Sequence, residues 1–208
     1  MTGSIQPTGP IHPTVLVHPS ADVDPAAVVG AGTRIWHQAQ VMAGATVGAD
    51  CILGKGAFLG PGTRLGDRVK IGNGAHLFGA TVGDDVMICP GALCLEDPAP
   101  RATGPDGLPK GAADFQRRPV TIEHGATIGA GALCAPGTVI GHHALVALGA
   151  VVHRDVPAHA LVAGNPARTA GWVCACATTL DDQLTCPACL RTYRRSPDGT
   201  LTQAPHNP

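Results

Sequence analysis

The chain has 208 residues, enough for one large domain or for one domain with an appendage. Its formal net charge of −1 gives no indication of a surface for polyanions or for acidic membranes. Aromatic residues make up only 3% of the chain and glycine is abundant. No apolar run approaches the roughly 20 residues that a membrane crossing needs. Residues 1–10 are polar, without a signal-peptide core. We therefore expect a soluble, cytoplasmic protein.

A six-residue repeat runs through most of the chain. From Ile11 to Leu77 an aliphatic residue returns at every sixth position, and a small or β-branched residue follows each one four places later. Neither a helix nor simple strand alternation gives a strict period of six, whereas short strands joined by corners do. Three sides close a coil of 18 residues, so each residue lies about 4.8 Å from the residue 18 places earlier. The repeat predicts an all-β fold, a parallel β-helix.

The repeat has one short step and one long interruption. After Leu77 the next aliphatic comes five residues later, at Val82, and a loop at 95–119 then replaces the pattern. Irregularities and long loops of this kind often lie beside functional sites. The repeat resumes from Ile122 to Val152, which gives about seven coils, and we expect 155–168 to cap the last one.

The end of the repeat carries a family resemblance. Gly149-Ala150-Val151-Val152, Asp155-Val156-Pro157 and the stretch Val162-Ala163-Gly164-Asn165-Pro166-Ala167-Arg168 resemble the left-handed β-helix (hexapeptide-repeat) acyltransferases. The resemblance implies a left-handed parallel β-helix over 11–170 and a homotrimer with sites between subunits. It also implies acetyl-CoA bound near the late coils as co-substrate, and transfer of the acetyl group to an amine or hydroxyl.

Further motifs resemble one subfamily. Arg34-Ile35-Trp36-His37, Val69-Lys70-Ile71-Gly72-Asn73, the long loop and Gly171-Trp172 are similar to bacterial N-acetyltransferases of UDP-2-acetamido-3-amino-2,3-dideoxy-glucuronate and related UDP-amino sugars. The resemblance implies a UDP-linked 3-amino uronate as acceptor, in surface-polysaccharide synthesis. That subfamily usually has Ile-Gln-Asn-Asn and a later Tyr, where this chain has Gly72, Gly74 and Phe78. An acetyltransferase of another small amine or hydroxyl, or a non-catalytic β-helix scaffold, remains the alternative.

The period of 18 residues predicts one polar column on a corner of the coils. It contains His37, Lys55 and Asn73, each two places after its aliphatic residue. Acetyl transfer from a thioester to an amine needs positioning and a proton acceptor. Asn73 and His37 are therefore catalytic candidates and Lys55 a substrate-binding one, and the alternative is a solvated column.

His76 is a second candidate base, beside the short step of the repeat. Phe78 and the loop residues Arg101 and Arg117 are further candidates for substrate binding. His124 and His142 are 18 residues apart and raise the zinc-dependent γ-class carbonic anhydrases as a rival with the same fold. That class uses two histidines five residues apart, and no such pair occurs here.

For acetyl-CoA, the family resemblance implies contacts of two kinds. Backbone amides of Ala130, Ala147 and Gly149 are expected along the pantetheine, and the side chains of Arg154 and Arg168 near the phosphates.

The eight cysteines form two groups. Four are scattered through the repeat, where each reads as a small buried hydrophobe. The other four form close pairs at the C-terminus: Cys174, Cys176, Cys186 and Cys189. Two such pairs predict a structural Zn²⁺ site, in preference to disulfides, in a zinc-ribbon-like segment over 171–195. Residues 1–10 and 196–208 are expected to be disordered.

Overall fold

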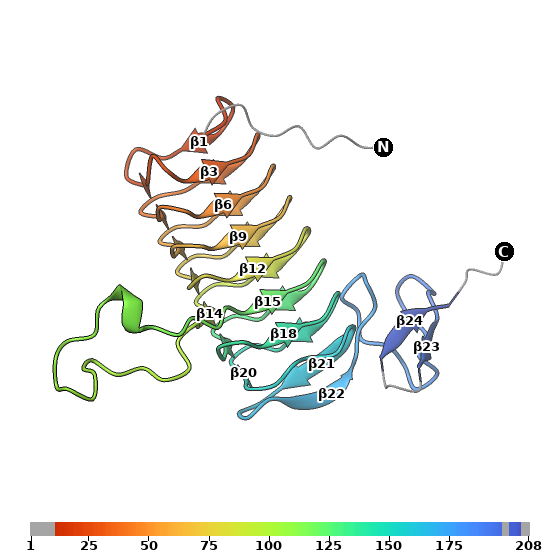
Figure 1. Cartoon of the computed structure of the whole chain (residues 1–208). Helices are drawn as coiled ribbons and strands as arrows, with labels where there is room; N and C mark the ends of the chain where they lie inside the picture. The colour runs from red at the N-terminus through yellow and green to blue at the C-terminus, as the bar shows by residue number, and fades with distance from the viewer. Residues whose placement is uncertain (1–10, 197–199, 205–208) are drawn as a thin grey trace.

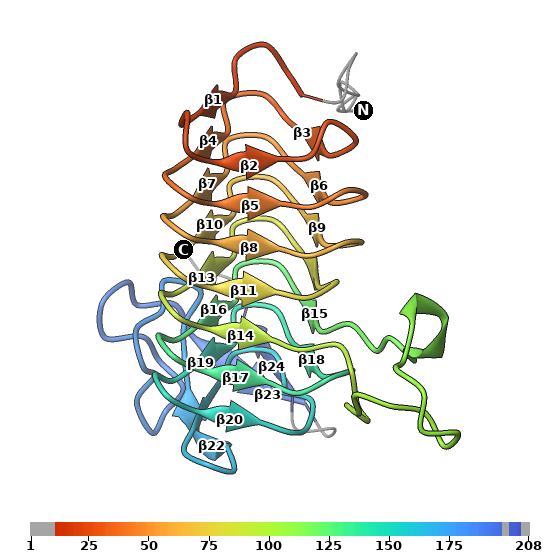
Figure 2. The ribbon, with the colours of Figure 1, turned by 90° about the vertical axis from the view of Figure 1, so that its left-hand side faces the viewer.

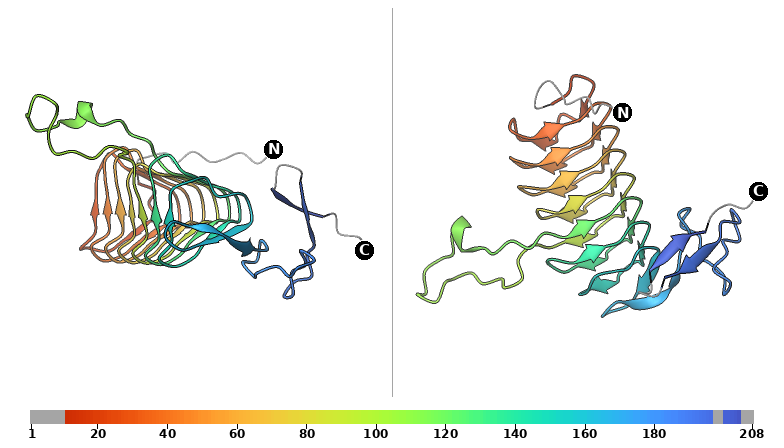
Figure 3. Two further views of the ribbon diagram at one scale, coloured as in Figure 1. Left: turned by 90° about the horizontal axis from the view of Figure 1, so that it is seen from below. Right: turned by 45° about the vertical axis from the view of Figure 1, so that its right-hand side comes forward.

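The computed structural model describes residues 11–196 and 200–204. The chain winds as a parallel β-solenoid of about eight turns, a triangular prism with three flat faces (Figures 1 and 3). The prediction of a β-helix is confirmed. In the described part of the chain, no helix has the length and apolarity that crossing a membrane requires.

Each face is a stack of two-residue strands. The first face contains β1 (Leu16–Val17), β4 (Arg34–Ile35), β7 (Ile52–Leu53), β10 (Lys70–Ile71), β13 (Met87–Ile88), β16 (Thr127–Ile128), β19 (Leu145–Val146), β21 (Ala160–Ala163) and the antiparallel β22 (Arg168–Trp172). The second face contains β2 (Asp22–Val23), β5 (Gln40–Val41), β8 (Phe58–Leu59), β11 (His76–Leu77), β14 (Leu93–Cys94), β17 (Leu133–Cys134) and β20 (Val151–Val152). The third face contains β3 (Val28–Val29), β6 (Thr46–Val47), β9 (Arg64–Leu65), β12 (Thr81–Val82), β15 (Thr121–Ile122) and β18 (Val139–Ile140).

The six-residue period places one aliphatic side chain of every strand in a continuous core. Leu53, Ile71 and Ile88 are successive members on the first face and are at most 2% exposed. The small residue four places later, such as Ala57 or Ala75, is equally buried beneath a corner. Strands pair in register 18 residues apart, as in Arg34 with Ile52, until the short step changes the offset to 17, as in Lys70 with Met87.

Three corners join the faces. The first corner lies between the first and second faces, the second between the second and third, and the third between the third and first. The short step and the long loop both lie at the second corner, in successive coils. The loop runs from Leu95 to Pro119, contains the 3-10 helix η1 (Ala112–Asp114) and projects from the prism (Figure 2). Its two ends meet where the Arg118 N–H donates to the Glu96 carbonyl at 2.7 Å.

The stack contains about one turn more than the expected seven. Val156 forms a bridge with Ile140, and β21 pairs with β19 in parallel. The segment expected only to cap the coil therefore adds further sides to it, because Val156 and Val162 are buried core residues.

A small unit follows β22. It contains the antiparallel pair β23 (Tyr193–Arg195) and β24 (Leu201–Gln203), and its core consists of Cys174, Leu180, Cys186, Tyr193 and Leu201. This differs from the expectation of a disordered 196–208, because Leu201 is 1% exposed and its strand closes the unit. Residues 1–10, 197–199 and 205–208 of the predicted disordered ends lie outside the described residues.

Candidate active site and cysteine cluster

The predicted polar column and the expected pantetheine-binding residues lie on one corner. His37, Lys55 and Asn73 are exposed at the first corner, and their carbonyls accept the N–H groups of the next coil. These hydrogen bonds between coils continue along the whole corner. The Gly91 N–H donates to the Asn73 carbonyl, the Gly131 N–H to the Pro90 carbonyl and the Gly149 N–H to the Ala130 carbonyl. Ala147 begins the last turn of this corner.

Asn73 has a structural task at this corner. Its Oδ1 accepts the Lys55 N–H at 2.9 Å, one coil earlier. Asp67 and Asp84 do the same on the third corner, where their Oδ1 atoms accept the N–H groups of Ala49 and Asp67 at 2.8 Å. The side-chain oxygen Oδ1 of Asn73 is therefore already hydrogen-bonded within the coil. Its side-chain nitrogen Nδ2 is left for a ligand.

His37 lies near the N-terminal end of the prism. Its ring stacks on that of His18 in the preceding coil, with the centroids 3.5 Å apart. Asn73 lies two coils further along the column than His37, in the coil that contains the short step.

His76 lies on the outward face of β11, between the first and second corners. Its ring is 5.8 Å from that of Phe58 and 6.4 Å from that of Phe78, so the three form an aromatic cluster on the second face. The His76 imidazole makes no hydrogen bond to any described residue, so both ring nitrogens are available to a ligand.

A cleft of about 360 Å³ lies at the base of the long loop, and we call it the loop cleft. It is lined by Phe78, Leu95, Glu96, Asp97, Pro100, Phe115 and Arg117. Two predicted substrate residues, Phe78 and Arg117, therefore meet there. The Arg117 guanidinium lies 3.7 Å from the Glu96 carboxylate and donates to the Pro61 carbonyl, which ties the loop to the coil.

Sequence reasoning missed Glu96, Asp97 and Phe115, because a loop without a repeat gives no register. The sequence offered one indication, which is that these residues lie near the two ends of the loop at 95–119. Arg101 does not line the loop cleft; it is exposed and donates to the Pro100 carbonyl.

A second cleft, of about 190 Å³, lies at the C-terminal end of the prism. This C-terminal cleft is lined by Val152, His153, Arg154, Asp155, Val156, Pro157, Val162, Ala167, Arg168 and Thr169. The structure thus brings together Arg154 and Arg168, the two arginines expected near the phosphates of acetyl-CoA. Ala147 is close to this cleft, but its N–H donates to the Val162 carbonyl, as the Gly149 N–H does to the Ala130 carbonyl. These two amides, predicted to contact pantetheine, are therefore already hydrogen-bonded within the coil.

The four C-terminal cysteines converge. Their sulfur atoms all lie within 4.8 Å of one another, and the contacts Cys174–Cys189, Cys176–Cys186 and Cys176–Cys189 measure 3.4, 3.6 and 3.7 Å. Zn–S bonds of about 2.3 Å place the sulfurs of a tetrahedral site about 3.8 Å apart. Hydrogen bonds with Thr178 lower the pKa of Cys176 to about 6, which favours the thiolate that binds metal. The donor set fits Zn²⁺.

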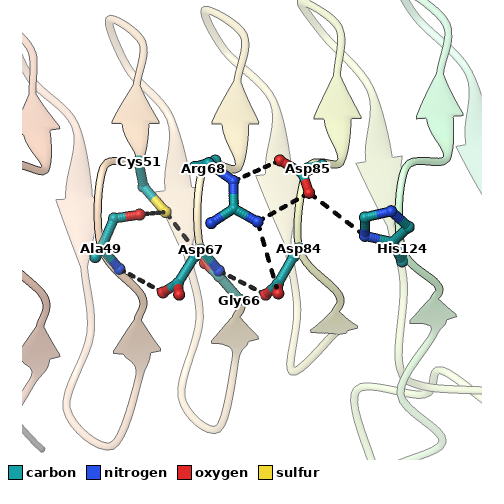
Figure 4. Close-up of polar contacts among 8 residues, drawn as sticks. All are labelled: Ala49, Cys51, Gly66, Asp67, Arg68, Asp84, Asp85 and His124. Carbon is teal, nitrogen blue, oxygen red and sulfur yellow. Dashed lines mark hydrogen bonds and ion pairs between the residues drawn. The ribbon is translucent and has the colours of Figure 1, made fainter. Parts of the chain in front are cut away.

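The third corner carries an ionic ladder (Figure 4). Arg68 pairs with Asp85 at 2.7 Å and lies 3.8 Å from Asp84, while Asp85 also faces His124 at 3.5 Å. The hydrogen bond from Arg68 lowers the pKa of Asp85. Behind the ladder, burial raises the pKa of the Cys51 thiol to about 11, as expected for a packing residue.

Four histidines lie at the third corner in the coils that follow, towards the C-terminal end of the prism. His124, His142, His143 and His159 follow one another with ring centroids 5.1 to 5.6 Å apart. Their nitrogens do not converge as ligands. Among the described residues, the four cysteines are the group of three or more His, Cys, Asp or Glu side chains placed to hold a metal.

Family models match the coils on both sides of the loop. The model described as bacterial transferase hexapeptide (six repeats) matches residues 26–61 and 44–79, and the hexapeptide repeat of succinyl-transferase matches 119–154. In both stretches the chain is similar to the hexapeptide-repeat transferases.

Curated relatives of the chain are N-acetyltransferases. It is 42% identical over 85 residues to dTDP-3-amino-3,6-dideoxy-alpha-D-galactopyranose 3-N-acetyltransferase of Aneurinibacillus thermoaerophilus, a match that covers 39% of this chain and 43% of the relative. It is 52% identical over 50 residues to 2,3,4,5-tetrahydropyridine-2,6-dicarboxylate N-acetyltransferase of Staphylococcus aureus, covering 24% and 21%. The chain thus matches less than half the length of these relatives.

Solved structures similar to the chain include the acetyltransferase domain of PglB from Neisseria gonorrhoeae in complex with acetyl coenzyme A. The TM-score is 0.47 at 26% identity, covering 75% of this chain and 57% of that one. AntD, an N-acyltransferase from Bacillus cereus in complex with dTDP and 3-hydroxybutyryl-CoA, gives 0.48 at 19% identity, covering 76% and 79%.

Proposed function

We propose that this protein transfers the acetyl group of acetyl-CoA to the amino group of a nucleotide-linked amino sugar in glycan biosynthesis. The acceptor is a nucleoside-diphosphate 3-amino sugar, and the uronate linked to UDP is the form that the subfamily motifs favour. The observation that carries the proposal is the C-terminal cleft, in which Arg154, at the second corner after β20, and Arg168, in β22, line one cavity at the C-terminal end of the prism.

The donor fits the first corner and this cleft together. The first corner is exposed at Ala130 and Gly149. The Gly149 N–H and the Ala130 carbonyl pair with each other, which leaves the Ala130 N–H and the Gly149 carbonyl for pantetheine. The two arginines supply positive charge for phosphates at the C-terminal end of the prism. A pantetheine that runs from the C-terminal end of the prism along the first corner has its thioester directed towards Asn73 and β11.

The acceptor fits the loop cleft. Phe78 and Phe115 offer apolar surface for a ring, and Arg117 offers a cation for a phosphate or a carboxylate. Lys55 on the first corner and Arg101 on the loop are additional cations for the acceptor. Glu96 and Asp97 add carboxylates that attract an ammonium group.

The reaction is direct aminolysis. The neutral amine attacks the thioester carbonyl, a C–N bond forms, and the C–S bond of the tetrahedral intermediate breaks to release the CoA thiolate. The proton lost by the amine passes to a base and from there to the thiolate. His76 is the base that the geometry favours, because it lies on the strand between the first corner and the loop cleft and its nitrogens are unoccupied. Asn73 contributes an amide N–H, and His37 is the remaining candidate for orienting the substrate.

The assembly is a homotrimer, with each site completed by a neighbouring prism. The loop supports this, because it projects from its own coil instead of lying along it (Figure 2). The four cysteines hold a structural Zn²⁺, since four sulfur ligands leave no position open for substrate.

The test is release of thiol from acetyl-CoA in the presence of UDP- and dTDP-linked 3-amino and 4-amino sugars, each with and without a C6 carboxylate. We expect turnover with a 3-amino sugar, and a loss of about 10²-fold or more in turnover number for His76→Ala. His12→Ala is the matched control, because His12 lies at the opposite end of the prism and is hydrogen-bonded to Thr14. A folded protein that releases no thiol with any acceptor, and does not bind CoA, contradicts the proposal and favours a scaffold.

A further inference from the structure

Strand β22 connects the C-terminal cleft with the cysteine cluster. It begins at Arg168, which lines the cleft with Thr169, and it ends two residues before Cys174. It is the outermost strand of the first face and pairs with β21 alone. Residues 168–170 are exposed. The position of Arg168 therefore depends on β21 and on whatever holds the far end of β22.

His159 holds that far end. The Val173 N–H donates to the His159 carbonyl at 2.8 Å, and the His159 Nδ1 bonds to the Val173 carbonyl at 2.9 Å. His159 is 3% exposed and lies in the last turn of the third corner. The two reciprocal hydrogen bonds fix the residue between β22 and Cys174 to the coil.

Tyr193 joins His159 to the cysteine cluster. Its ring is 4.8 Å from the imidazole of His159. Its hydroxyl donates to the Cys174 Sγ at 3.1 Å and accepts the Ala175 N–H at 3.0 Å. A second contact reaches β22 itself, because the Arg195 guanidinium lies over the ring of Trp172, 4.9 Å from its centroid.

The C-terminal unit has too small a core to keep these contacts by itself. Its buried residues are Cys174, Leu180, Cys186, Tyr193 and Leu201, and two of the five are sulfur ligands. In units of this size the free energy of metal binding is the free energy of folding. Without the metal, Tyr193 loses the support that holds it against His159.

We propose that zinc in the four-cysteine site strengthens binding of the acyl donor, with His159 and Tyr193 as positioning residues that hold β22 and thereby Arg168. The inference rests on the proposed function for the identity of the donor, and it adds a role for the C-terminal unit. Because coupling between two binding sites is reciprocal, CoA should equally tighten the binding of zinc.

The experiment measures CoA binding by calorimetry on the full chain, loaded with one Zn²⁺ and after removal of the metal with a chelator. We expect CoA to bind about 5-fold or more weakly without zinc, and full affinity to return when zinc is added. Hydrogen exchange provides a readout independent of activity, since the backbone amides of β22 should exchange faster in the metal-free chain.

Two variants separate positioning from folding, and both are measured with zinc bound. Tyr193→Phe keeps the ring and removes the hydroxyl that reaches Cys174. His159→Asn removes the ring, and Asn tolerates the positive φ of +61° at this position. Both should retain one Zn²⁺ per chain and bind CoA as weakly as the metal-free parent. Arg168→Ala should weaken CoA with and without zinc.

The outcomes are distinguishable. Equal CoA affinity with and without zinc, or zinc-loaded variants that bind CoA like the parent, overturns the coupling and leaves the proposed function intact. Absence of CoA binding in every form overturns the proposed function itself. If the metal-free chain unfolds as a whole, the two zinc-loaded variants still decide the question.

Discussion

Asn73 illustrates how one side chain can serve both the coil and a reaction. Its Oδ1 is bonded to the Lys55 N–H, while its amide nitrogen makes no hydrogen bond to any described residue. The two atoms can be tested separately, because the third corner shows that an aspartate fills the same structural role at Asp67 and Asp84.

We expect Asn73→Asp to keep the stability of the parent and to lose turnover, because the acceptor oxygen remains and the N–H donor disappears. Asn73→Ala should lose both turnover and about 0.5–1.5 kcal/mol of stability, the usual contribution of one hydrogen bond. Chemical denaturation and the thiol-release assay, applied to both variants, provide the comparison. Full turnover in Asn73→Asp would leave Asn73 a purely structural residue.

His159 makes the end of the coil sensitive to pH. Burial lowers the pKa of His159 to about 4 from its ordinary 6.5, and the neighbouring His143 and His142 act in the same direction. Between these two values the unfolded chain binds more protons than the folded one. Stability is therefore complete above about pH 6.5 and falls as the pH drops towards 4.

We expect the thermal midpoint of the parent to fall between pH 6.5 and pH 4 by more than that of His159→Asn, which has no imidazole to protonate at this position. Measuring both chains with zinc bound and after chelation separates acid release of zinc from protonation of His159. Parallel curves for the two chains would show that His159 does not contribute to the acid sensitivity.

The long loop is the element that distinguishes this coil from a plain prism. Its ends are adjacent, since the Arg118 N–H donates to the Glu96 carbonyl, and Arg117 fastens it to Glu96 and Pro61. The coil above and below continues in register through Thr81 with Thr121. The loop is thus an insertion that the coil does not need for its own pairing.

We expect a chain in which residues 97–117 are replaced by about four Gly and Ser residues to keep the melting temperature of the coil. A shorter loop costs less closure entropy. The Michaelis constant for the acceptor should rise about 10-fold or more, because uniform binding energy is lost, while CoA affinity stays unchanged. Phe78→Ala, which alters the loop cleft and leaves the loop in place, is the companion variant. An unchanged Michaelis constant in both would remove the acceptor from this cleft.

At the scale of the whole molecule, the prism leaves apolar side chains uncovered along its length. Leu16 is 65% exposed and Leu148, at the first corner beside Gly149, is 79% exposed. Apolar side chains with such large exposed fractions are explained if flat faces of neighbouring prisms associate and cover them.

We expect the protein in solution to have three times the chain mass of 21.0 kDa, measured by sedimentation equilibrium. Leu148→Lys should lower the association state or weaken CoA binding, since the first corner would face a neighbouring prism. Ser20→Lys on the same corner near the N-terminal end is the control. A monomer at all concentrations, with full CoA binding, would contradict sites between subunits.

The sequence by itself determined the coil. A period of six places one aliphatic side chain of every strand inward and one small residue beneath each corner, so the strands and their register follow from counting residues. The fourfold convergence of Cys174, Cys176, Cys186 and Cys189 was likewise predictable, because metal-ligand spacing is local. The column of His37, Lys55 and Asn73 also followed from the period.

Only the tertiary structure decided what the irregular segments do. The loop has no repeat and therefore no register. Counting residues could not predict that Phe78 and Arg117 meet Glu96, Asp97 and Phe115, nor that Arg101 lies outside this cleft. The union of Arg154 with Arg168, the pairing of β21 with β19 and the contact of Tyr193 with His159 arise after the repeat ends. Where the chain leaves its repeat, neighbours are set by packing between residues distant in sequence, and no local spacing encodes them.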